Sequence, residues 1–269
     1  MGPTWPGGPH GEPVAPHALT PRNIEIRSNF DAIAPRYDLT NRVISMGVDL
    51  RWRRVAVRRL GDLGPEALVL DLACGTGDMA IEVLRQGRAA RVVGADLSRA
   101  MLELARTKLA ARAGARRRGA AGSAAAPVGD GAARVHLVGA PAESLPFPDG
   151  AFDGVTIAFG IRNVPDYRGG LREMARVLRR GGRACVLEFS TPPSKWLWKA
   201  YNYYFFNVLP RIGGLITGRE DAYRYLTHSV AGFPGAAAFA GVMEECGFAR
   251  VSWMAMNGGI VCVHTGEKP

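Results

Sequence analysis

Short apolar runs alternate with segments of helical period through the middle of this chain. The runs predict five strands, at residues 68–73, 91–95, 134–138, 152–158 and 183–189. The segments between them predict helices at residues 78–86, 98–111 and 168–178. Strands that alternate with helices pair in parallel, and both faces of such a sheet are covered. The pattern therefore predicts an α/β fold built on a doubly wound, mostly parallel sheet.

The two ends of the chain depart from this alternation. Residues 1–21 are rich in Pro and Gly and predict a disordered tail, which leaves residues 22–269 as a single domain. At the other end, a predicted helix at 235–246 precedes strand-like runs at 248–256 and 259–264. Because the turn Asn257-Gly-Gly259 joins these two runs closely, they predict an antiparallel hairpin.

Two internal segments also interrupt the pattern. Residues 113–133 consist mainly of Ala, Gly and Arg and predict a flexible surface insertion. Residues 191–233, which we call the aromatic lid, hold seven aromatic side chains within positions 196–206. Aromatic residues are favoured where one side of a segment is dry and the other wet. The aromatic lid is therefore expected to cover an apolar ligand, either facing a membrane or packed on a small core of its own.

Charge and cysteine spacing limit the classes of function. A net charge of +10 favours an anionic partner, either nucleic acid or a membrane surface. Residues 111–134 contribute five arginines against one aspartate, so the insertion supplies much of this excess. The four cysteines form no C-x-x-C pair, so the sequence predicts no metal site, and a reduced cytoplasmic setting fits.

The most informative motif is the glycine turn in residues 69–78, where an apolar run ends in Asp71. A second apolar run ends in Asp96, 25 positions later. In doubly wound folds this arrangement builds a nucleoside pocket at the carboxyl ends of the first two strands. Gly75 and Gly77 let the backbone approach the ligand, Thr76 can bond its amino-acid end, and Asp96 can accept from ribose hydroxyls.

Asp71 discriminates between the nucleoside cofactors that this pocket can hold. A carboxylate beside the ligand would repel the pyrophosphate of a dinucleotide, whereas it suits a ligand with an ammonium group and a sulfonium. The chain also ends in a hairpin instead of a second mononucleotide-binding half. Both observations favour S-adenosyl-L-methionine as the cofactor.

Three segments together resemble the class I S-adenosylmethionine-dependent methyltransferases: the glycine turn, residues 149–155 and residues 171–182. That resemblance implies a Rossmann-like, seven-stranded sheet whose final strand is reversed. Four further blocks resemble the quinone-biosynthesis C-methyltransferases, the demethylmenaquinone methyltransferases and the overlapping 2-polyprenyl-6-methoxy-benzoquinol methylases. They are residues 30–41, 70–78, 159–164, and 209–213 with 223–226.

This second resemblance implies methylation of a ring carbon of a prenylated quinol, converting demethylmenaquinol to menaquinol. Methylation of a benzoquinol, or of both acceptors, is the alternative. The cofactor-binding residues expected on this basis are Asp71, Gly75, Thr76, Gly77, Asp96, Leu97, Pro141, Ala142 and Ala158. Members of the family usually carry Asn or Asp where this chain has Pro141, which has no amide donor, so adenine recognition would depend on Ala142.

Methylation of a quinol needs a base and a group that stabilises the developing oxyanion. Arg162 and Asn163, at the end of the fourth strand, are the first candidates, because a guanidinium can hold an oxyanion or polarise a water. Tyr37 and Asp38 are expected to close over the site, and in a dry pocket Asp38 could act as the base. His228 and Asp166 are alternative bases.

A methyltransferase acting on RNA or protein is the alternative from another class, and the net charge favours it. The Asn/Asp-Pro-Pro-Tyr motif that amino-methylating enzymes carry at the fourth strand is replaced here by residues 158–164, which opposes that alternative. We therefore expect a prenylated quinol and a transient membrane-surface contact as partners, and no nucleic acid. The expected location is cytoplasmic, peripheral at the inner face of the membrane, and a homodimer remains open.

Overall fold

A computed structural model describes residues 19–89, 91–120 and 134–269. It contains seven strands: β1 (Leu68–Leu72), β2 (Arg91–Asp96), β3 (Val135–Gly139), β4 (Phe152–Ala158), β5 (Leu178–Phe189), β6 (Ala249–Met256) and β7 (Val261–Glu267). The helices before and within the sheet are α1 (Pro21–Ile33), α2 (Tyr37–Ile44), α3 (Asp49–Leu60), α4 (Asp78–Arg85), α5 (Arg99–Ala120) and α6 (Tyr167–Val177). After β5 come α7 (Lys195–Tyr203), the π-helix η3 (Tyr204–Val208), α8 (Leu209–Thr217), α9 (Glu220–Ala231) and α10 (Ala236–Glu245).

The strands form one sheet in the order β3-β2-β1-β4-β5-β7-β6. Strands β1 to β5 pair in parallel, and β7 runs antiparallel to both β5 and β6. This arrangement confirms the predicted fold class and the terminal hairpin. Asp71 pairs with Gly94 on one side and with Thr156 on the other, so the carboxyl ends of β1, β2 and β4 meet at one edge.

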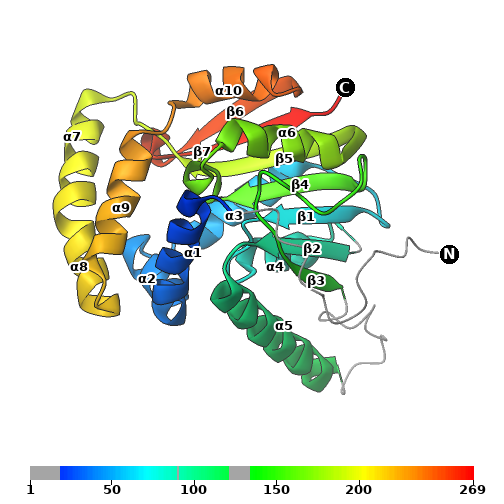
Figure 1. The fold of residues 1–269 in the computed structure, drawn as a ribbon, viewed down its shortest axis with the longest axis horizontal. Helices are drawn as coiled ribbons and strands as arrows, with labels where there is room; N and C mark the ends of the chain where they lie inside the picture. Colours follow the sequence, from blue (N-terminus) through cyan, green and yellow to red (C-terminus); the bar gives the residue numbers. More distant parts are fainter. Residues whose placement is uncertain (1–18, 90, 121–133) are drawn as a thin grey trace.

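Both faces of the sheet are covered by helices (Figure 1). Alternate residues of β1 enter opposite cores: Leu70 packs in a cluster with residues of α6 and α10, whereas Val69 packs with residues of α3 and α4. The aromatic lid has its own small core, formed by Tyr201, Phe205, Leu209, Tyr223 and Val230. Figure 1 shows α7, α8 and α9 gathered at one end of the molecule, beside α1 and α2.

Several element boundaries differ from the sequence-based expectations. Helix α5 continues to Ala120, beyond the predicted end near residue 111, because Ala and Arg have high helix propensity. Strand β5 starts at Leu178, five residues before the predicted strand at 183–189, and it includes Gly181 and Gly182. A Cβ at Gly182 would come within 2.8 Å of the Arg179 carbonyl oxygen, so this position requires glycine. Most of the predicted tail (1–18) and of the insertion (121–133) lies outside the described residues.

Candidate active site

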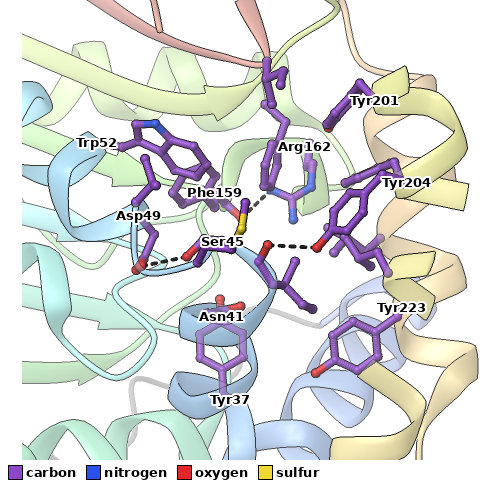
Figure 2. A pocket seen from close by; sticks show the side chains of 18 of the residues that line it. Tyr37, Asn41, Ser45, Asp49, Trp52, Phe159, Arg162, Tyr201, Tyr204 and Tyr223 are labelled. Atoms are coloured by element: carbon purple, nitrogen blue, oxygen red, sulfur yellow. Dashed lines mark hydrogen bonds between the residues drawn. The ribbon is translucent and has the colours of Figure 1, made fainter. Parts of the chain in front are cut away.

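Two cavities meet at the carboxyl edge of the sheet. The larger has a volume of about 360 Å³ and lies between the aromatic lid, helices α2 and α3, and the ends of β4 and β5 (Figure 2). The smaller lies over the ends of β1, β2 and β4, and α1 supplies part of its wall. Phe30, Tyr37, Phe159 and Asn163 line both cavities. A ligand in one cavity would therefore lie next to a ligand in the other.

Six of the nine expected cofactor-binding residues line the smaller cavity: Gly75, Asp96, Leu97, Pro141, Ala142 and Ala158. The Asp96 carboxylate accepts hydrogen bonds from the Gly75 and Ser98 amides, each at 2.8 Å. Burial raises the pKa of the Asp96 carboxyl above its ordinary value. Since each carboxylate oxygen accepts more than one hydrogen bond, Asp96 can also accept from a ligand hydroxyl.

Asp71 lies below the glycine turn, outside the lining of this cavity. Its carboxylate is fully buried and accepts from the Ala80 amide at 3.0 Å and from the Thr156 hydroxyl at 2.9 Å. Burial raises the pKa of Asp71 to about 7. Asp71 therefore fixes the strand end to the start of α4. Gly77 supports the turn instead of lining the cavity, with a left-handed φ of 82° and a Cβ position 3.5 Å from Ala105.

Thr76 and Asp38 belong to a charged network on the outer side of the glycine turn. The Thr76 hydroxyl donates to Asp38 at 2.6 Å, and the Lys108 ammonium lies 2.6 Å from the same carboxylate. Lys108 and Arg42 also pair with Asp78. Asp38 thus ties α2 to the glycine turn and α5, and it lines neither cavity, in contrast to the dry position expected for a base.

The lining of the smaller cavity fits a nucleoside. Gly75 has a φ of 53°, which favours glycine, and a Cβ there would be in van der Waals contact with the Tyr37 ring at 4.0 Å. Asp96 offers acceptors at the end of β2, and Leu97 and Ala142 supply an apolar surface next to it. The residues present therefore fit a nucleoside cofactor, although Pro141 contributes no amide donor.

The larger cavity is rich in aromatic residues. Phe159 lies at the end of β4 with a left-handed φ of 59°, a conformation that is strained for a bulky residue. Its ring centroid lies 4.8 Å from that of Phe189 and 5.9 Å from that of Trp52. The Phe159 carbonyl accepts from Arg162 Nη1 at 2.7 Å and from Asn163 Nδ2 at 3.4 Å. The unusual backbone thus holds Arg162 and Asn163 in place.

Arg162 forms a buried ion pair with Glu188, the penultimate residue of β5. Arg162 Nη1 lies 2.6 Å from Glu188 Oε1, and the side chains are only 6% and 1% exposed. Burial raises the pKa of the Glu188 carboxyl, whereas Arg162 acts to lower it. Glu188 was missed at the sequence level. The same signal that identified Asp71 and Asp96, an acid that closes an apolar run, was present there too.

Unpartnered polar atoms are concentrated in this larger cavity. Among the described residues, six buried side-chain nitrogen or oxygen atoms have no hydrogen-bond partner. Four of the six belong to residues lining the cavity: Arg53 Nε, Arg162 Nε, Asn163 Oδ1 and Tyr201 Oη. Buried polar groups are normally paired. The cavity is therefore suited to a largely apolar ligand that carries a few oxygen atoms.

The two alternative bases lie away from both cavities. His228 is exposed on α9, where its ring contacts Phe206. Asp166 caps α6 by accepting from the Gly169 amide at 2.8 Å. Of the four expected catalytic residues, the structure thus brings together Arg162, Asn163 and Tyr37 and leaves Asp38 apart. Figure 2 shows Tyr37 and Arg162 entering the cavity from α2 and from the sheet edge.

Comparison with known proteins gives consistent matches over nearly the whole chain. The model of the ubiE/COQ5 methyltransferase family matches residues 20–268. The chain is 44% identical to a ubiquinone/menaquinone biosynthesis C-methyltransferase UbiE from Geobacter sp., over 94% of this chain and 100% of that protein. It is 45% identical to a demethylmenaquinone methyltransferase from Thermus thermophilus, over 89% and 100% of the two chains. Among solved structures, an S-adenosylmethionine-dependent methyltransferase from Thermotoga maritima superposes with a TM-score of 0.60 at 17% identity, covering 91% and 100%.

Proposed function

The chain belongs to the ubiE/COQ5 methyltransferase family, and from this premise we propose that it methylates a ring carbon of a prenylated quinol. S-adenosylmethionine is the methyl donor, demethylmenaquinol is the favoured acceptor, and a benzoquinol of the ubiquinone pathway is the alternative. The observation that carries the proposal is the larger cavity, which adjoins the smaller one and whose lining residues carry four buried polar atoms without a hydrogen-bond partner among the described residues. A flat quinol ring with two oxygens has the chemistry that such a cavity recognises.

When bound, S-adenosylmethionine supplies an electrophilic methyl group on its sulfonium. This chain's residues must then align the acceptor carbon with that methyl and raise the electron density of the ring. The two ligands would meet at the wall that both cavities share, which is formed by Phe30, Tyr37, Phe159 and Asn163. Asn163 Oδ1 can accept from the ring hydroxyl beside the reacting carbon and so orient it.

Arg162 stabilises the negative charge that develops on the same ring oxygen. Its Nε has no hydrogen-bond partner among the described residues. With S-adenosylmethionine bound, the hydroxyl proton would pass to water, and the electron-rich ring carbon would take the methyl group as the methyl–sulfur bond breaks. The ring carbon would then release its own proton to water, which restores the aromatic ring. Glu188 holds Arg162 in this position.

The prenyl tail of the acceptor must leave the cavity. Met46 lines the cavity and is 84% exposed, so the cavity reaches the surface just after α2. We give the name apolar rim to Met46 and the exposed apolar residues of α2, α7 and α8: Leu39, Val43, Trp196, Tyr203 and Leu215. Figure 1 places α2, α7 and α8, which carry this rim, at one end of the molecule.

We propose that the apolar rim rests on the membrane surface that holds the prenylated acceptor. Trp196 and Leu215 are more than four-fifths exposed, which is unusual for large apolar side chains unless a surface covers them. In the described part of the chain, no helix is long and apolar enough to cross a bilayer. Replacing Trp196 and Leu215 together by Ser should reduce co-sedimentation with anionic phospholipid vesicles. Trp253→Ser, on β6, is the matched control.

The acceptor is identified by quinone mass spectrometry of a strain from which this gene is deleted. Accumulation of a demethylated naphthoquinone is the expected result. Expression of the wild-type chain in this strain should restore the methylated naphthoquinone. Accumulation of an unmethylated benzoquinone would instead select the alternative acceptor. An unchanged quinone pool together with turnover on RNA or protein would overturn the proposed function.

A further inference from the structure

Tyr201 brings a polar group from the aromatic lid to the larger cavity, where the quinol acceptor would bind. It lies in α7, lines the larger cavity and is 8% exposed. Its ring stacks on Phe205 with a centroid distance of 4.9 Å, so the side chain is held by packing. The hydroxyl nevertheless has no hydrogen-bond partner in the part of the chain that the structure describes. Figure 2 shows Tyr201 on the aromatic-lid side of the cavity, with Arg162 in its centre.

We propose that the Tyr201 hydroxyl donates to the quinol oxygen remote from the methylated carbon, making Tyr201 a positioning residue that selects acceptors with two ring oxygens. This inference rests on the proposed function. The Arg162 and Asn163 side chains hold the oxygen next to the reacting carbon, because Asn163 also lines the cofactor cavity. Tyr201 lines only the larger cavity and so lies farther from the point of methyl transfer.

The protonation state of Tyr201 agrees with a donor role. Burial raises the pKa of its hydroxyl, so the group keeps its proton at neutral pH. A buried donor without a partner costs free energy, and a ring oxygen of the acceptor would remove that cost. An analogue lacking this oxygen would leave the hydroxyl unpaired. Sites that bond a substrate oxygen discriminate strongly against analogues without it, for this reason.

The contrast with Tyr204, three residues later, supports a ligand-binding role for Tyr201. The Tyr204 hydroxyl donates to the Ile44 carbonyl at 3.0 Å and so joins the aromatic lid to α2 within the protein. Two tyrosines of one segment thus differ in the use of their hydroxyl groups. One hydroxyl is used by the protein, and the other is left for whatever occupies the cavity.

The test is a binding cycle with two naphthols that share the same prenyl chain. One carries both ring oxygens, and the other lacks the oxygen remote from the carbon that would be methylated. Dissociation constants are measured anaerobically by calorimetry, with S-adenosylhomocysteine present, for the wild-type chain and for Tyr201→Phe. The wild type is expected to bind the two-oxygen ligand about three- to tenfold more tightly. Tyr201→Phe is expected to lose that preference while it retains affinity for the one-oxygen ligand.

Tyr204→Phe is the control, since it removes a lid hydroxyl that is already paired. Its preference between the two naphthols should match that of the wild type, whatever its effect on overall affinity. A Tyr201→Phe chain that keeps the wild-type preference would overturn the inference, as would a wild type without any preference. The proposed function is judged separately by methyl transfer to the two-oxygen ligand, which the binding cycle does not require.

Discussion

Replacing Arg162 by Met separates the role of the guanidinium in chemistry from its role in folding. The change leaves Glu188, which is 1% exposed, without its counter-ion. Removing one partner of a buried ion pair typically costs about 3–5 kcal/mol. Turnover should be abolished, because no cation remains to hold the ring oxyanion. Binding of S-adenosylhomocysteine should stay within a few-fold of wild type, since Arg162 does not line the cofactor cavity.

The stability loss should depend on pH in a direction fixed by Glu188. Burial already raises the pKa of this carboxyl, and removal of Arg162 takes away the main opposing influence. An acid whose folded pKa lies above its unfolded value is most favourable at low pH, and it destabilises the fold as the pH rises through the folded pKa. Urea denaturation of Arg162→Met should therefore show a deficit that grows from acidic to alkaline pH.

The double variant Arg162→Met with Glu188→Gln provides the matched comparison. Neutralising position 188 should recover most of the lost stability and remove the pH dependence, because no buried charge is left unpaired. Methyl transfer should remain absent in the double variant. Recovery of turnover in it, or loss of cofactor binding in a folded Arg162→Met chain, would refute the assignment of Arg162 to the oxyanion.

Three further substitutions test the cofactor side of the site. Asp96→Ala should weaken S-adenosylhomocysteine binding by about 1–3 kcal/mol in calorimetry, because a buried acceptor is lost. The stability of the wild type should fall by about 4 kcal/mol between about pH 4 and pH 7, because the folded state holds a proton on Asp71, whose pKa is about 7. Asp71→Asn should remove this fall, as measured by urea denaturation. Pro141→Asn should tighten cofactor binding about two- to tenfold in the same calorimetric titration, because it supplies an amide donor and a polar side chain.

Each of these has a clear contrary result. Unchanged affinity in Asp96→Ala would argue against a nucleoside at the end of β2. A pH profile of Asp71→Asn that still follows the wild type would show that another group carries the titration. Weaker binding by Pro141→Asn would mean that the proline ring itself packs on the ligand.

The sequence predicted the sheet, and it predicted that Gly75 and Asp96 lie at one edge of it, for a local reason. Gly75 and Asp96 are identified by their position at strand ends, and the parallel register brings those ends to one edge. Asp71 shares that signal, yet its carboxylate turns into the protein and accepts from Ala80 and Thr156. Which way an acid at a strand end points depends on packing around it, and local sequence does not specify this.

The acceptor side was less predictable because its residues come from distant segments. Tyr37, Arg53, Arg162 and Tyr201 line one cavity only after α2, α3 and the aromatic lid have packed against the sheet edge. Their place at the end of the fourth strand made Arg162 and Asn163 candidates, but the sequence did not show which carboxylate pairs with Arg162. The role of Tyr201 depends on a missing partner, which only the folded chain reveals.

Helices α1 and α2 precede the first strand, yet they supply Phe30 and Tyr37 to the wall between the two cavities. A chain shortened to begin at β1 would keep every strand and the glycine turn, but it would lose Phe30 and Tyr37 from the wall between the two cavities. Divergence in the first forty described residues would then alter acceptor choice while the sheet stays the same. Two chains could therefore share the whole sheet and still differ in acceptor, if they differ in the segment ahead of the first strand.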